Sequence, residues 1–275
     1  LASAFALFGI AVALFGIGTF PQVNAIADAA MLTFSMPKWI TGLVLAVLVA
    51  MITLGGIRSI SRVSIAVVPF MAIFYIIACV TVLGMNAELL PGAISSVLTS
   101  AFSSTAATGG FAGATIMLAL QAGVARGVFS NESGLGSAPI AAAAAKTNDP
   151  VRQALVSMTQ TFIDTLVVCT MTALIILISP FWQQGVSPSE LTMKSFELYL
   201  GSFGGYVVIL STILFAYSTI LGWSYYGEKA FEYIFGEKKV RLYRILFIAV
   251  VMVGAMMKLT FVWDFSDLMN GMMAI

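Results

Sequence analysis

The chain has 275 residues, of which 60% are hydrophobic and only 9% are charged, and its mean hydropathy is +1.02. Soluble domains carry about 25% charged residues, so this composition indicates a membrane protein. A net charge of +1 offers nothing that favours nucleic acid. The sequence has no histidine, which excludes histidine metal sites, histidine general bases and histidine proton relays.

Apolar runs follow one another along the whole chain. A spanning helix needs about 20 mostly apolar residues. Two stretches between such runs, 91–106 and 187–202, mix Ser, Thr and apolar residues and are predicted to be interfacial helices. Because both chain ends lie in apolar runs, we expect a fragment that lacks an N-terminal part. About eight spans are predicted, at 3–30, 39–54, 64–85, 113–145, 153–178, 206–235, 242–257 and a truncated one from 261.

Lys and Arg residues predict the orientation, because basic residues are retained on the cytoplasmic side. On one side of the membrane, the only basic residues in the predicted connections are Lys38, Lys194 and Lys258. The first helix is therefore predicted to run outward. The cytoplasmic connections would carry Arg58, Arg62, Lys146, Arg152, Lys229, Lys238, Lys239, Arg241 and Arg244.

The predicted span 113–145 changes character between Gly127 and Pro139, where Gly, Ser, Asn131 and Glu132 replace apolar residues. Such residues free the backbone from helical bonding, which hydrocarbon tolerates only where the backbone is buried in protein or lines a wet cavity. Freed N–H groups suit a carboxylate and freed carbonyls suit a cation, so one break can hold an amino acid with its driving ion. The alternative is a small-residue kink that lets helices pack closely.

Asp164 is another acid deep within a predicted span, in the run QTFIDTLVVCT. With Thr161 and Thr165 one helical step away, it resembles half of an oxygen-lined cation site. A hydrogen-bond brace to a neighbouring helix is the alternative. Cys79 and Cys169 also lie in apolar runs, which predicts core packing rather than a disulfide.

Polar residues interrupt two further spans. Gln22 follows Pro21 in GIGTFPQVNAIADAA, where these two residues and Asn24 interrupt an otherwise continuous apolar helix. An amide there can bond a substrate or satisfy a freed carbonyl. Thr219 and Trp223 lie four apart on one face of a predicted helix, where a hydroxyl beside a rigid indole can cap a small pocket.

The segment GVARGVFSNESGLGSAPIA resembles the signature of the alanine or glycine:cation symporters, also called sodium:alanine symporters. GIGTFPQVNAIADA and YSTILGWSYYGEKAFEY resemble two further segments of that family, although Pro21 departs from its pattern. The resemblance implies an all-α, polytopic membrane protein with the leucine-transporter-type inverted-repeat fold and a discontinuous helix near 130–136. By that scheme 1–275 is a single transporter domain with the third to tenth helices, and the N-terminal helices are missing.

The resemblance also implies the residues of the site. It makes Ser218 and Thr219 candidates for binding sodium, in addition to Asp164 from the residue pattern. The implied substrate contacts are Gln22, Phe129, Ser130, Asn131, Gly134, Thr219 and Trp223.

We therefore expect a multi-pass protein of the plasma (inner) membrane that carries a small neutral amino acid, alanine or glycine, together with sodium by alternating access. Its expected partners are the amino acid, the lipid bilayer and the missing N-terminal helices, with no nucleic acid and no cofactor besides co-transported sodium. The alternatives are an ion channel with Glu132 and Asp164 lining its pore, or another amino-acid transporter of the same superfold. An enzyme is not expected, since no nucleophile elbow or paired-aspartate signature is present.

Overall fold

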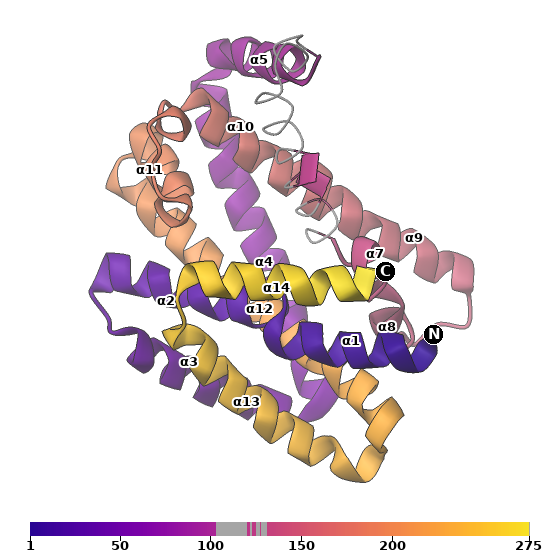
Figure 1. Ribbon diagram of the computed structural model, residues 1–275. Coiled ribbons are helices and arrows are strands. Elements are labelled where there is room, and N and C mark those ends of the chain that lie inside the picture. The colour runs from indigo at the N-terminus through magenta and orange to yellow at the C-terminus, as the bar shows by residue number, and fades with distance from the viewer. Residues whose placement is uncertain (103–119, 122, 125–126, 128–130, 275) are drawn as a thin grey trace, which may run out of the picture. The chain divides into compact units, whose positions relative to one another are not determined.

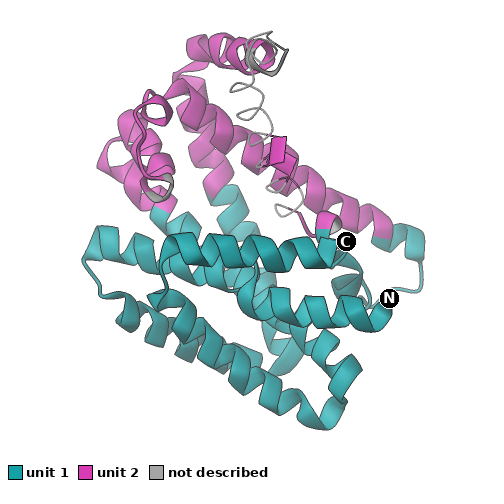
Figure 2. Ribbon diagram, in the orientation of Figure 1, with its two compact units in different colours: residues 1–74, 135–153, 209–275 teal, residues 75–134, 154–208 magenta. Residues whose placement is uncertain are grey.

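The computed structural model describes residues 1–102, 120–121, 123–124, 127 and 131–274, and every regular element among them is a helix. These residues form two compact units, which Figure 2 distinguishes by colour. Unit 1 comprises Leu1–Phe74, Leu135–Gln153 and Ile209–Ile275, and unit 2 comprises Tyr75–Gly134 and Ala154–Val208.

Among the described residues, four helical stretches are long and apolar enough to cross a membrane. They are Ala2–Phe34, Gly56–Met85, Pro150–Ile178 and Ser202–Phe235. They correspond to four of the predicted spans, and together they make an all-helical, polytopic membrane protein. Three other predicted spans are shorter helices, namely α3 (Lys38–Thr53), α13 (Val240–Met256) and α14 (Leu259–Ala274). Of the predicted span 113–145, most of residues 113–130 lie outside the described residues.

Unit 1 is built on the contact between α3 and α13, which lie side by side in Figure 1. A Cβ added at Gly42 of α3 would lie 2.8 Å from the Ala255 Cβ of α13, so small residues bring these two backbones close together. α2 (Phe20–Phe34) packs against both helices, and α1 (Ala2–Phe15) packs along α14.

The core of unit 1 also includes part of α12 (Ser202–Phe235), through Ala216 and Ile220. Aromatic side chains are part of this core. Tyr243 and Phe247 are fully buried, and Phe15 and Phe20 meet edge to face with ring centroids 5.5 Å apart. The core therefore holds α2, α12 and α13 against one another around the segment that joins α1 to α2.

Unit 2 contains α5 (Leu90–Phe102), α10 (Thr170–Ile178) and α11 (Pro188–Leu200), with most of α9 (Pro150–Thr161) and the end of α4 (Gly56–Met85). Hydroxyl bonds join α10 to α4 and to α11: Tyr75 Oη lies 2.7 Å from Thr172 Oγ1, and the Tyr199 hydroxyl donates to the carbonyl of Ile178. α5 and α11 cover most of the two stretches predicted as interfacial helices.

Both cysteines are free thiols. Cys79 is buried, as predicted for core packing. Cys169 is exposed, so the prediction of core packing was wrong for that residue. An apolar run shows that a helix suits lipid, but it does not show which side of the helix faces protein.

Candidate functional site

The first span is broken between α1 and α2. α1 ends at Phe15, residues 16–19 form a turn, and α2 begins at Phe20. The sequence predicted the interruption at Pro21 to Asn24, and this placement was wrong. Pro21 lies in the first turn of α2, where backbone N–H groups have no acceptor within the helix. The missing N–H of proline therefore costs nothing there, and Pro21 favours the start of the second helix rather than disrupting a continuous one.

Side chains of the same segment satisfy backbone groups that the break frees. The Gln22 amide nitrogen donates to the carbonyl of Ile17 at 3.1 Å, and the Thr19 hydroxyl donates to the carbonyl of Ala13 at 2.6 Å. Of the two roles predicted for the Gln22 amide, the structure therefore shows the one of satisfying a freed carbonyl. The amide oxygen Oε1 takes no part in that bond and remains an acceptor.

Trp223 of α12 lies directly against this turn. A Cβ added at Gly18 would lie 2.6 Å from Cγ of the indole, so only glycine lets the backbone approach the ring so closely. Trp223 is 3% exposed and meets Tyr226 edge to face with ring centroids 5.4 Å apart. Gln22 and Trp223, far apart in the sequence, therefore contact adjacent residues of one turn.

Ser218 and Thr219 lie one turn before Trp223 on α12 and are half-buried. Both hydroxyls donate to the carbonyl of Phe215, at 2.8 Å and 2.9 Å. A hydroxyl that donates in this way keeps lone pairs that can accept a hydrogen bond or bind a cation. These two residues can thus supply oxygens, whereas their donor hydrogens are already used.

The described part of the predicted discontinuous helix is indeed discontinuous. A four-residue helix, α7 (Glu132–Leu135), and a short helix, α8 (Ala138–Ala142), are separated by Gly136 and Ser137. Gly136 has a φ of +72°, a left-handed conformation that favours glycine. Phe129 and Ser130 lie outside the described residues.

Asn131, just before α7, lies between two threonines of the Pro150–Ile178 helix. The Thr161 hydroxyl donates to Asn131 Oδ1 at 3.4 Å, and Asn131 Nδ2 donates to Thr165 Oγ1 at 3.5 Å. Asn131 is 6% exposed, and the backbone N–H of Gly134 donates to its carbonyl at 3.0 Å. Asn131 and the long helix are thus joined within unit 2 by a cluster of three polar side chains.

The helix that carries these threonines is wider than an α-helix at this point. Residues Phe162–Cys169 form a π-helix, a rare conformation found frequently at functional sites. Asp164 lies within it, is half-buried, and is hydrogen-bonded to the Thr165 side chain. The polar cluster of unit 2 therefore includes a carboxylate beside the Asn131 contacts.

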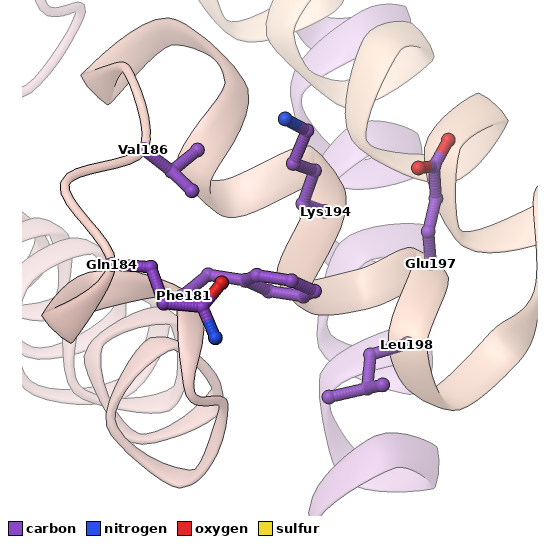
Figure 3. Close-up of a pocket in the computed structure, with 6 residues that line it drawn as sticks. All are labelled: Phe181, Gln184, Val186, Lys194, Glu197 and Leu198. Carbon is purple, nitrogen blue, oxygen red and sulfur yellow. The ribbon is translucent and has the colours of Figure 1, made fainter.

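Two grooves in unit 2 contain none of the predicted site residues. One has a volume of about 690 Å³ and lies along η1 (Ala87–Leu89) and α5. The other has a volume of about 420 Å³. Figure 3 shows that the Lys194 and Glu197 head groups of its lining point to the same side. Its lining residues are Phe181, Gln184, Val186, Lys194, Glu197 and Leu198.

The predicted residues divide between the two units. Gln22 and Trp223 lie in unit 1 at the α1–α2 turn, and Ser218 and Thr219 lie in the same unit one helical turn before Trp223, while Asn131, Gly134 and Asp164 lie in unit 2. Sequence analysis did not identify two residues of α14, Ser266 and Asn270, which also bond to this turn. Their spacing of four residues in an apolar helix was the available signal.

Comparison with known proteins gives a consistent result. The model of the sodium:alanine symporter family matches residues 1–275. The chain is 50% identical over 279 residues to the sodium/alanine symporter AgcS of Methanococcus maripaludis, and the alignment covers 100% of this chain and 60% of that protein. It is 49% identical over 276 residues to an uncharacterized transporter of Haemophilus influenzae, with the same coverage.

A more distant relative is a probable sodium/glutamine symporter, GlnT, of Bacillus subtilis. It is 36% identical over 256 residues, which are 92% of this chain and 53% of that protein. The chain thus spans 60% or less of the length of these relatives. The matched family consists of transporters rather than enzymes.

Proposed function

Because the chain belongs to the sodium:alanine symporter family, we propose that the whole protein carries a small neutral amino acid, alanine or glycine, together with sodium across the plasma membrane. Transport would proceed by alternating access, in which the loaded site opens to each side of the membrane in turn. The 50% identical relative is described as a sodium/alanine symporter, which supports alanine as the substrate and sodium as the ion. The relative named for glutamine is more distant, at 36% identity.

We propose that residues 1–275 form a single transporter domain with the leucine-transporter-type inverted-repeat fold. In that fold the chain would supply the third to tenth helices, and the preceding helices would lie in the remainder of the protein. The all-helical architecture and the short helices around Gly136 and Ser137 support this assignment.

The observation that carries the proposed function is the packing of Trp223 on the Gly18 turn beside Gln22. With Thr219, these residues would form one wall of the substrate site. The wall is neutral, with an amide oxygen, a hydroxyl and a rigid aromatic ring. Such a surface suits a ligand with a short uncharged side chain.

We propose that Phe129, Ser130, Asn131 and Gly134, at the interrupted helix near 130–136, also contact the substrate. The hydrogen bond that the Thr161 hydroxyl donates to Asn131 supports this, because it helps to hold the residue that precedes α7 in a defined position. A buried amide next to a helix break can bond the polar groups of an amino acid.

Sodium is a hard cation that prefers oxygen ligands. We propose that the Ser218 and Thr219 hydroxyls contribute to its site, since their lone pairs are not used by the bonds to Phe215. Asp164, in unit 2, is a separate acidic candidate for cation binding. Its place within the π-helix, next to Thr165, supports a role in cation binding rather than in packing.

The test is uptake of labelled alanine by the whole protein in liposomes. Uptake should saturate with alanine and should require an inward sodium gradient, which potassium does not replace. Trp223→Ala should reduce uptake at least tenfold, whereas Leu210→Ala, at an exposed position of the same helix, should not. Uptake that ignores sodium, or normal uptake by the Trp223 variant, would overturn the proposal, and a non-saturable current would indicate a channel instead.

A further inference from the structure

Helix α14 contributes two buried polar side chains to the α1–α2 turn. Ser266 and Asn270 have no exposed surface and lie four residues apart, so they are on the same face of the helix. The Ser266 hydroxyl donates to the carbonyl of Phe15 at 3.1 Å. Asn270 Oδ1 accepts the N–H of Ile17 at 3.2 Å. One helix thus bonds an acceptor at the end of α1 and a donor in the turn that follows it.

The bond to Ile17 fixes how the Asn270 amide is oriented. A backbone N–H needs an acceptor, so Oδ1 must face the turn and Nδ2 must point away from it. Nδ2 is buried and has no protein partner among the described residues. Gly16 makes the approach possible, because a Cβ at that position would lie 2.6 Å from Asn270 Oδ1.

The same peptide segment is held from several sides at once. The N–H of Ile17 is bonded to Asn270, and its carbonyl is bonded to Gln22. The next residue, Gly18, abuts the indole of Trp223. A shift of the peptide at Ile17 would therefore move the amide of Gln22 and change the space beside Trp223.

We propose that Asn270, assisted by Ser266, is a positioning residue of the substrate site. It holds the 16–19 turn so that Gln22 and Trp223 meet the amino acid in the correct geometry, without touching the substrate itself. Because freed backbone groups are costly in hydrocarbon, the turn is held in one arrangement only while both α14 bonds are made. This inference rests on the proposed function.

The experiment measures the KM and Vmax of sodium-dependent alanine uptake by whole-protein variants. Asn270→Ala should raise KM about five- to tenfold, as expected for loss of a buried hydrogen bond, with Vmax per folded transporter changed by less than twofold. Ser266→Ala should raise KM less. Asn270→Asp keeps the acceptor for Ile17 and should restore most of the affinity. Leu268→Ala, on the exposed side of the same helix, is the matched control.

A second readout does not depend on transport. With the other tryptophans replaced by phenylalanine, the wavelength of maximum fluorescence emission of Trp223 should shift in Asn270→Ala. It should remain unchanged in Leu268→Ala. An unchanged KM with only lower thermal stability would overturn the proposal, since it would mean a purely structural brace. If the Asn270→Ala protein does not fold, Ser266→Ala decides the question by the same criteria, and Asn270→Asp should leave both KM and the Trp223 emission close to those of the unaltered protein.

Failure of the proposed function would appear differently. In that case the unaltered protein itself would lack sodium-dependent alanine uptake. The emission of Trp223 would then still report whether Asn270 holds the turn, and an unshifted spectrum in Asn270→Ala would refute the positioning role independently.

Discussion

The guanidinium of Arg244 in α13 binds both carboxylate oxygens of Glu228 in α12. Nε lies 2.7 Å from Oε2, and Nη2 lies 2.8 Å from Oε1. The remaining terminal nitrogen donates to the carbonyl of Leu54 at 3.2 Å, at the end of α3. One side chain thus joins the ends of three helices, and Glu228 is largely buried.

Breaking this bidentate pair should destabilise the protein. Arg244→Lys keeps the charge but loses the planar pair of donors, and Glu228→Gln loses the charge, so each should cost about 2 kcal/mol. Thermal unfolding in detergent measures this. Lys229→Ala is the control, because its pair with Glu232 is solvent-exposed and worth under about 1 kcal/mol. If the Arg244 and Glu228 variants unfolded at the same temperature as Lys229→Ala, a structural role for Arg244 would be contradicted.

Gly18→Ala should disrupt the candidate site. The added Cβ would lie 2.6 Å from Cγ of Trp223, so the turn or the ring must move, and overpacking of this kind costs about 1–3 kcal/mol. We expect at least a tenfold loss of alanine uptake per folded protein. Gly84→Ala is the matched control, because nothing lies within 4 Å of its added Cβ. Normal uptake by the Gly18 variant would show that this contact does not shape the site.

The threonine contacts of Asn131 should matter for transport. Replacing Thr161 and Thr165 together by valine removes these two hydroxyl contacts of Asn131 at nearly constant volume. Because the bonds are long, we expect a moderate fall in uptake, about two- to fivefold, whereas Asn131→Leu should abolish uptake. The control is Thr159→Val on the same helix, whose hydroxyl bonds only locally, to the carbonyl of Val156. If the double variant transports at the normal rate, the cluster is only a packing feature.

Sodium dependence tests the proposed hydroxyl ligands. Thr219→Ala and Ser218→Ala should raise the sodium concentration for half-maximal uptake several-fold, and Thr219→Ser should restore it because the oxygen is retained. Ser224→Ala removes a hydroxyl with the same local bond and should leave that concentration unchanged. If these variants lose affinity for alanine while the sodium concentration for half-maximal uptake stays normal, the two hydroxyls bind the substrate and not sodium.

Much of the helical framework was predictable because membrane helices are specified locally. Runs of apolar residues predicted the four long helical stretches and the shorter α3, α13 and α14. Composition also predicted an interruption near 130–136, where Gly136 adopts a left-handed conformation that favours glycine. The family was identified from the same region, and the comparisons confirm it.

The sequence by itself thus determined an all-helical membrane protein, its family, and Gln22 and Trp223 as polar or bulky residues out of place in an apolar helix. Only the tertiary structure decided that the first break lies at 16–19 and that Asn270, 253 residues away from Ile17, serves it. The physical reason is the separation along the chain over which each interaction acts. Helix formation depends on neighbours within a turn or two, whereas the partner of a freed N–H depends on which distant helix packs beside it.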